Sequence, residues 1–95
     1  MALFTIIMEL DGGTYTSQVQ ADDEWNALLR WPAQLKVEEI KGLGEKMRQR
    51  IIGEIEHYPE FNQPISLSGM ANVWYIMLLV WGKRIEINII KTAED

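Results

Sequence analysis

Histidine and carboxylate side chains could bind a metal in this chain, which has a single histidine and no cysteine. Glu54 and His57 stand three positions apart, a spacing that helical carboxylate metal sites use because it places both side chains on one helix face. Such sites need further ligands from other helices, and no second histidine supplies one. His57 also precedes Tyr58 and Pro59, where the end of a helix favours a cation. We therefore expect neither a metal nor another cofactor.

Covalent catalysis needs a nucleophile beside a base, and the sequence offers no recognisable pair of this kind. Cysteine is absent, and no serine stands in the G-x-S-x-G pattern that exposes a nucleophile on a sharp turn. The phosphate-binding patterns GxxxxGK and GxGxxG do not occur. The one tight carboxylate cluster, Asp22-Asp23-Glu24, is explained by capping of a helix N-terminus. We predict that the protein is not an enzyme.

The segment 37–52, VEEIKGLGEKMRQRII, carries two glycines among hydrophobic residues. It resembles the helix-hairpin-helix motif of nucleic-acid-binding proteins, in which a hydrophobic-Gly-hydrophobic-Gly turn joins two short helices. The matching residues are Ile40, Gly42, Leu43, Gly44 and Ile51. In that family the backbone amides of the turn and nearby lysines hold a DNA phosphate without reading its sequence. The resemblance implies weak, sequence-independent nucleic-acid binding as the alternative function, with a phosphate site formed by Gly42, Gly44, Lys41 and Lys46.

Composition and charge bound the partners and the location. The 95 residues suffice for one domain, 1–95, and the net charge is −5. This acidity disfavours a nucleic-acid partner, because phosphate binding relies on lysine and arginine. The longest apolar run, Val73 to Trp81, is less than half of the about 20 residues that a membrane helix needs. With no signal-peptide pattern and no cysteine, we expect a cytoplasmic protein that does not span a membrane.

Two β-hairpins are predicted from the alternation of apolar and polar residues. The first covers residues 2–20, with a two-residue loop at Gly12-Gly13. The second covers residues 73–92, with a loop at Gly82-Lys83 that suits a type II′ turn. The resulting cross-strand partners are Leu10 with Tyr15, and Val80 with Ile85.

Two helical segments separate the hairpins. The first opens at Asp22-Asp23-Glu24 and ends at Trp31, because Pro32 disfavours helical geometry in the residue before it. The second covers 35–57, and two glycines at 42 and 44 predict a break within it, since glycine destabilises helix interiors. Residues 65–67 are expected to form a short edge strand. The apolar stripe of the first helix comprises Trp25, Leu28 and Leu29, which leaves Trp31 off the stripe.

The order ββ-αα-ββ predicts an α+β fold, an antiparallel sheet of four to five strands with helices packed on one face. The other face then carries apolar residues of the last hairpin. A contiguous apolar patch larger than roughly a few hundred Å² on a small monomer usually marks an interface, and exposed tryptophans are enriched at binding hot spots. The predicted interface residues are Val73, Tyr75, Met77, Leu79, Ile90, Trp81 and Trp31. The alternative is that a loop, or residues 59–72, closes this face.

These features favour a small, non-enzymatic protein-interaction module inside the cell. It would form a homodimer, bind a protein partner, or do both. An inhibitor, an immunity-type protein or a regulatory subunit fits this description. An acidic inhibitor could cover a basic enzyme such as a nuclease, steered to it by opposite charge.

Overall fold

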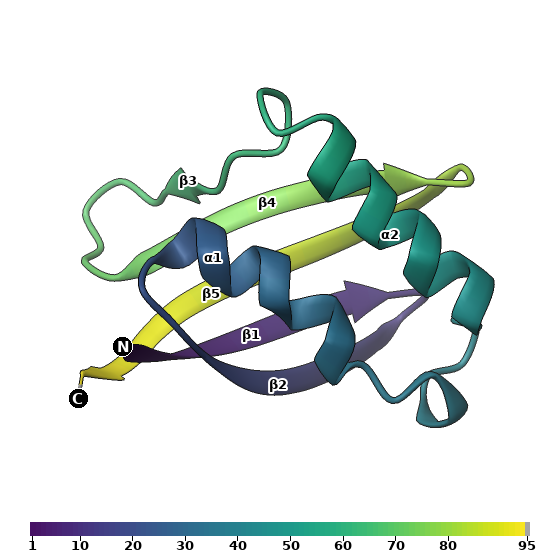
Figure 1. Ribbon diagram of the computed structural model, residues 1–95, viewed down its shortest axis with the longest axis horizontal. Helices are drawn as coiled ribbons and strands as arrows, with labels where there is room; N and C mark the ends of the chain where they lie inside the picture. The colour runs from purple at the N-terminus through teal and green to yellow at the C-terminus, as the bar shows by residue number, and fades with distance from the viewer. Residues whose placement is uncertain (95) are drawn as a thin grey trace.

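The computed structural model describes residues 1–94, which form a five-stranded antiparallel sheet with two helices on one face (Figure 1). The predicted α+β class and the helices on one face are confirmed. The strands are β1 (Ala2–Leu10), β2 (Gly13–Ala21), β3 (Ile65–Ser66), β4 (Val73–Val80) and β5 (Lys83–Glu94). The helical elements are α1 (Glu24–Arg30), α2 (Glu45–His57) and two 3-10 turns, η1 (Trp31–Gln34) and η2 (Val37–Glu39). The strand order β2-β1-β5-β4-β3 places the first and last strands of the chain side by side within the sheet.

The core lies between the sheet and the helices and uses every second residue of the central strands, because successive side chains point to opposite faces. Its members on β1 and β5 include Phe4, Ile6, Met8, Ile85, Ile87 and Ile89. Helix α2 contacts β4 and adds Met47, Ile51 and Ile55 to the same core, at four-residue spacing. The intervening strand residues therefore lie on the opposite face of the sheet.

Both hairpin turns begin one residue earlier than predicted. The loops are Asp11-Gly12, where Gly12-Gly13 was expected, and Trp81-Gly82, where Gly82-Lys83 was expected. Both residues of each loop have positive φ, which is the geometry of type I′ turns and corrects the predicted type II′ turn. The pairs that close the loops are Leu10 with Gly13, and Val80 with Lys83. Each register thus moves by two residues, and because side chains alternate with a period of two, the predicted faces are unchanged.

Trp31 is a core residue, and its predicted place in a surface interface is wrong. It follows the last residue of α1 but keeps helical backbone angles, φ −57° and ψ −45°. It therefore stands one turn beyond Ala27 on the same face, and both side chains are 0% exposed. The prediction failed because alanine was not counted as a marker of the buried face.

The N-terminus of α1 agrees with the prediction. It is capped by Asp23, whose Oδ1 accepts a hydrogen bond from the backbone N–H of Asn26 at 2.8 Å. The helix ends at Arg30, but Trp31 keeps helical angles despite Pro32 and the chain continues into η1, so the reason given for this end is wrong.

The segment before α2 also differs from the prediction. The predicted break is present, since Gly42 has φ +85° and α2 starts directly after Gly44. Before the break the chain forms only the three-residue turn η2. The two helices expected from the helix-hairpin-helix resemblance are therefore reduced to one.

His57 is the last residue of α2, as expected, and a buried asparagine closes this helix end. The Asn62 side-chain amide donates to the backbone carbonyl oxygens of Glu54, at 2.9 Å, and of Tyr58, at 3.1 Å. It also donates to the Glu54 carboxylate at 3.2 Å. Glu54 thus binds Asn62 at the C-terminus of α2 through both its backbone oxygen and its carboxylate. This structural role is an alternative to metal binding with His57.

Candidate interaction surface

Both helices lie on one side of the sheet (Figure 1), and the opposite side is called the open face here. Every second residue of β4 points to the open face and is apolar. These residues, Val73, Tyr75, Met77 and Leu79, are called the β4 stripe. Met77 is 39% exposed and Leu79 is 62% exposed, whereas Val73 and Tyr75 are half-buried. The loop that precedes β4 therefore does not cover the open face around Met77 and Leu79, near the end of β4.

Neighbouring strands widen the stripe at the end where β4 begins. Ile90 of β5 is the cross-strand partner of Val73, and Ile65 of β3 is the partner of Tyr75. Partners share a face, so both isoleucines join the stripe. Ile65 is 65% exposed and was not predicted, because only the strand order places β3 beside β4. At the other edge of the face, β2 presents uncharged polar side chains: Thr14, Thr16, Gln18 and Gln20.

Three charged side chains stand beside the stripe on the open face: Glu86 and Arg84 on β5, with Arg84 opposite Leu79, and Glu9 on β1, one strand further away. Glu86 of β5 lies opposite Met77, and Glu9 of β1 lies opposite Glu86. The Tyr75 hydroxyl donates a hydrogen bond to Glu86 Oε1 at 3.4 Å. Burial of the phenol, together with the negative charge of Glu86, raises the pKa of Tyr75 above its ordinary value of 10.0. Tyr75 is therefore neutral at physiological pH, and the stripe itself carries no charge.

Trp81 stands at the end of β4 in a backbone conformation that tryptophan rarely adopts. Its φ is +53°, and its side chain is 60% exposed. The first loop position of a type I′ turn favours Asn, Asp or Gly, and another residue in the left-handed region costs ~1–2 kcal/mol. Because most of the side chain is exposed, contacts within one copy of the chain offset little of this cost. A strained backbone that displays a large aromatic side chain is typical of a binding contact.

The Gly42-Leu43-Gly44 turn, at the centre of the predicted phosphate site, lies beside an ion pair between the two hairpins. Lys83 Nζ is 2.6 Å from Asp11 Oδ2. A Cβ atom added to Gly42 would stand 2.8 Å from the same carboxylate oxygen, so the Asp11 side chain would have to shift, and the positive φ favours glycine in addition. The Asp11 carboxylate and the Lys83 ammonium neutralise each other here, so this side of the turn offers an anion no net positive charge.

A second carboxylate stands at the start of α2, where the resemblance places the phosphate. The Glu45 side chain accepts hydrogen bonds from Arg48, at 2.6 and 3.1 Å, and these hold the pKa of Glu45 below its usual value. Lys41, Lys46 and the flanking glycines are exposed. The ionised Glu45 already occupies the positive end of the helix dipole, and it opposes phosphate binding there.

The described part of the chain, residues 1–94, contains no group of three or more metal-ligating side chains placed to hold an ion. Within the same residues no helix is long and apolar enough to cross a membrane. No protein-family model, curated protein or solved structure matches this chain. Its surfaces are therefore the basis for a functional proposal.

Proposed function

We propose that this protein is an interaction module that forms a homodimer by packing the β4 stripe of one copy on the β4 stripe of another. The observation that supports the proposal is the exposure of Met77, Leu79 and Trp81, which ranges from 39% to 62%. Monomeric proteins rarely expose a contiguous apolar patch larger than roughly a few hundred Å², and burying one such side chain is worth ~1.5–3 kcal/mol. Self-association removes several of them from water at once.

Stripe-on-stripe packing is compatible with the charges that border the stripe. Two sheets that stack face to face lie about 10 Å apart, with their strands roughly aligned. If the two-fold axis runs parallel to β4, the stripes meet in the middle. The two Glu86 carboxylates then fall on opposite sides of the contact, and so do the two Arg84 side chains, which lie on the same strand. No like charges are brought together, and the uncharged stripe makes the association insensitive to salt.

The dimer keeps its helix layers on the outside, where a further protein can bind. The net charge of −5 favours a basic partner through long-range attraction. The module would then act as an inhibitor, an immunity-type protein or a regulatory subunit.

Sedimentation equilibrium at low and high salt tests the dimer on the wild type, Met77→Glu and Ala33→Glu. We expect a wild-type dimer at both salt concentrations and at least about tenfold weaker association for Met77→Glu, because a carboxylate would be buried without a partner. Ala33 is exposed in η1, on the helix side, so Ala33→Glu adds the same charge without changing the dimer.

Met77→Glu also places a carboxylate opposite Glu86, which destabilises the strand pair. Met77→Lys avoids this repulsion and should split the dimer as well, and circular dichroism confirms that each variant is folded. A wild-type protein that is monomeric at high concentration would contradict the proposal. A dimer that survives both substitutions at position 77 would place the contact elsewhere.

A further inference from the structure

Strand β2 forms one edge of the sheet and lacks the features that usually protect an edge. It is nine residues long and pairs continuously with β1, without a bulge. Its sequence, GTYTSQVQA, contains no charged residue and no proline. Natural edge strands are commonly shortened, bulged, charged or interrupted by proline, because their free backbone groups attract another strand. The opposite edge follows this rule, since β3 has only two residues.

The unpaired backbone groups of this edge belong to alternate residues. The β1–β2 loop is closed by the Leu10–Gly13 pair, so odd-numbered residues of β2 exchange hydrogen bonds with β1. The N–H and C=O groups of Thr14, Thr16 and Gln18 therefore point away from the sheet. Gln20 fits the same pattern, because its carbonyl oxygen points outward and accepts a hydrogen bond from Arg30 Nη1 at 2.8 Å. Three consecutive outward residues remain free to pair with a further strand.

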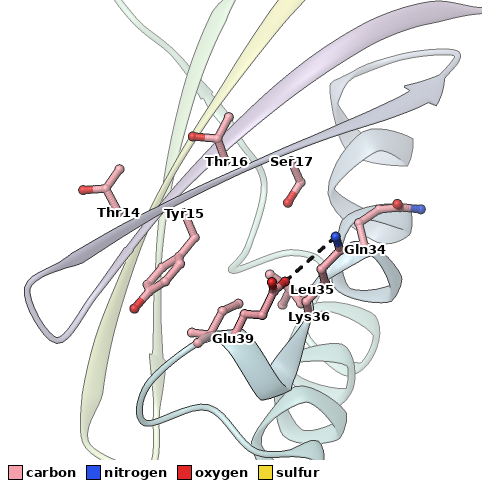
Figure 2. A pocket seen from close by; sticks show the side chains of 9 residues that line it. Thr14, Tyr15, Thr16, Ser17, Gln34, Leu35, Lys36 and Glu39 are labelled. Atoms are coloured by element: carbon pink, nitrogen blue, oxygen red, sulfur yellow. Dashed lines mark ion pairs between the residues drawn. The ribbon is translucent and has the colours of Figure 1, made fainter.

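A groove of about 320 Å³ follows this free part of the edge. One wall is β2 from Thr14 to Ser17, and the other is the segment from Gln34 to Ile40 that links α1 to α2. Figure 2 shows Tyr15 on the side of the strand that faces this segment, and Thr14 and Thr16 on the other side. Lys36 and Glu39 form an ion pair at 3.9 Å, so the charges along the groove compensate each other.

We propose that the β2 edge binds an extended, uncharged peptide segment of a partner protein, which adds to the sheet as a sixth strand beside Thr14, Thr16 and Gln18. Alternating backbone donors and acceptors are complementary to another extended backbone, and main-chain hydrogen bonds give such complexes their affinity. Alternate side chains of the peptide enter the groove beside Tyr15, where small apolar residues fit. The remaining side chains lie beside the threonines of the open face.

The groove favours a single extended segment over a second copy of this chain. The segment from Gln34 to Ile40 forms the wall of the groove on the helix side of the sheet. A strand added beside β2 would therefore clash with this segment if the strand carried a helix layer of its own on the same side. The β2 strand of another copy brings its own helix layer and its own 34–40 segment to that position. A terminal or unstructured segment of a partner has neither.

Hydrogen exchange and peptide titration on the wild-type protein test this proposal. The probe is an acetylated and amidated peptide of about seven residues in which valine alternates with threonine, and a version with a central proline is its control. In the free protein the amides of Thr14, Thr16 and Gln18 should exchange quickly, whereas those of Tyr15 and Ser17 are protected by β1. The valine–threonine peptide should protect the three fast amides, and the proline peptide should not.

A pair of variants at Thr16 tests whether the outward amide is the contact. Thr16→Pro removes only an N–H that points away from the sheet, so the pairing with β1 remains. We expect it to weaken peptide binding at least about tenfold. Thr16→Val keeps the N–H group and should bind the peptide like the wild type. If Thr16→Pro fails to fold, the protection pattern of the wild type still decides the question.

Each outcome has a definite meaning. Absence of protection at peptide concentrations up to about 1 mM would overturn the proposal. Protection of the three amides that rises with protein concentration, without peptide, would overturn it in favour of pairing between two copies. Peptide binding that is unchanged in Thr16→Pro would place the peptide elsewhere. The Met77→Glu variant, designed to be monomeric, should bind the peptide like the wild type. The peptide experiment can therefore fail or succeed independently of the dimer experiment.

Discussion

Replacing Trp81 by asparagine should make the folded monomer more stable and the dimer weaker. Trp81 occupies the first loop position of a type I′ turn with φ +53°, and Gly82 follows with φ +75°. Asn-Gly is the preferred pair for such a turn, whereas tryptophan has no favourable contact there with its own backbone. Trp81→Asn therefore relieves strain in the monomer and removes an aromatic side chain from the proposed interface.

The expected gain follows from the turn geometry and the exposure of the side chain. A residue other than Gly, Asn or Asp in the left-handed region costs ~1–2 kcal/mol. Trp81 is 60% exposed, so losing its remaining contacts returns part of that gain. We expect the free energy of unfolding to rise by about 1 kcal/mol, which corresponds to roughly 4–8 °C in Tm for a domain of this size.

The assay has to separate monomer stability from dimerisation, because association raises the apparent stability. Urea unfolding is therefore measured in the Met77→Glu background, and dimerisation is measured by sedimentation equilibrium without that substitution. Trp81→Ala is the matched control, since alanine also removes the indole ring but is not favoured at positive φ. Both variants should weaken the dimer, and only asparagine should add stability.

Two results would refute this reasoning. Equal stabilities of the asparagine and alanine variants would show that the backbone at position 81 is not strained in solution. Unchanged dimerisation in both variants would show that Trp81 lies outside the contact between copies. Either result would remove the support that the strained turn gives to the interface.

Further predictions concern the core, the Gly42 turn and the loss of stability at acidic pH. Trp31→Ala should lower the free energy of unfolding by ~3–5 kcal/mol in urea titrations, because the side chain is fully buried. Gly42→Ala should cost ~1–2 kcal/mol in thermal unfolding, because its φ is positive. Gly44→Ala, at the N-cap of α2 with φ −111° and open space around it, should cost less, ~0.5–1 kcal/mol, because alanine is a poorer N-cap than glycine. Hydrogen bonds from Arg48 and Gln49 lower the pKa of Glu45, so its ionised form stabilises the folded protein. This stabilisation is complete when the pH is above the usual pKa of 4.5, and it is lost as the pH falls through the lowered pKa of the folded state. The stability difference between wild type and Glu45→Gln should therefore shrink on acidification from neutral pH, and salt should reduce it.

The sequence predicts which strand residues share a face more reliably than which residues pair. Both loops were placed one residue too late. Gly12-Gly13 is an acceptable type I′ pair beside Asp11-Gly12, and Gly82-Lys83 fits a type II′ turn, whereas tryptophan at position 81 is disfavoured in the loop that actually forms. The error moved each register by two residues, and alternation kept Met77 and Leu79 on the open face. In α1 the assignment of residues to faces failed for Trp31. Trp31 stands one helical turn beyond Ala27, and both side chains lie on the buried face.

The parts of the candidate sites that sequence could not predict depend on strand order. Ile65 lies next to the β4 stripe only because β3 pairs with β4, and β2 has a free edge only because the second hairpin pairs with β1 and not with β2. Long-range pairing of this kind leaves no local pattern, since the β1–β5 contact joins opposite ends of the chain. The absence of charge in β2 was visible in the sequence, but it gains meaning only once β2 is known to be an edge.

The two proposed surfaces can be occupied at the same time, because the sheet separates them. Met77 lies on β4, and Thr16 lies on β2 at the far edge, with β5 and β1 between them. Stripe-on-stripe packing covers the β4 side of the open face, whereas the peptide adds in the plane of the sheet beside β2. Substitutions at distant sites without shared partners have additive effects. The dimer would then carry two peptide sites on opposite edges, which raises its affinity for a partner that presents two such segments.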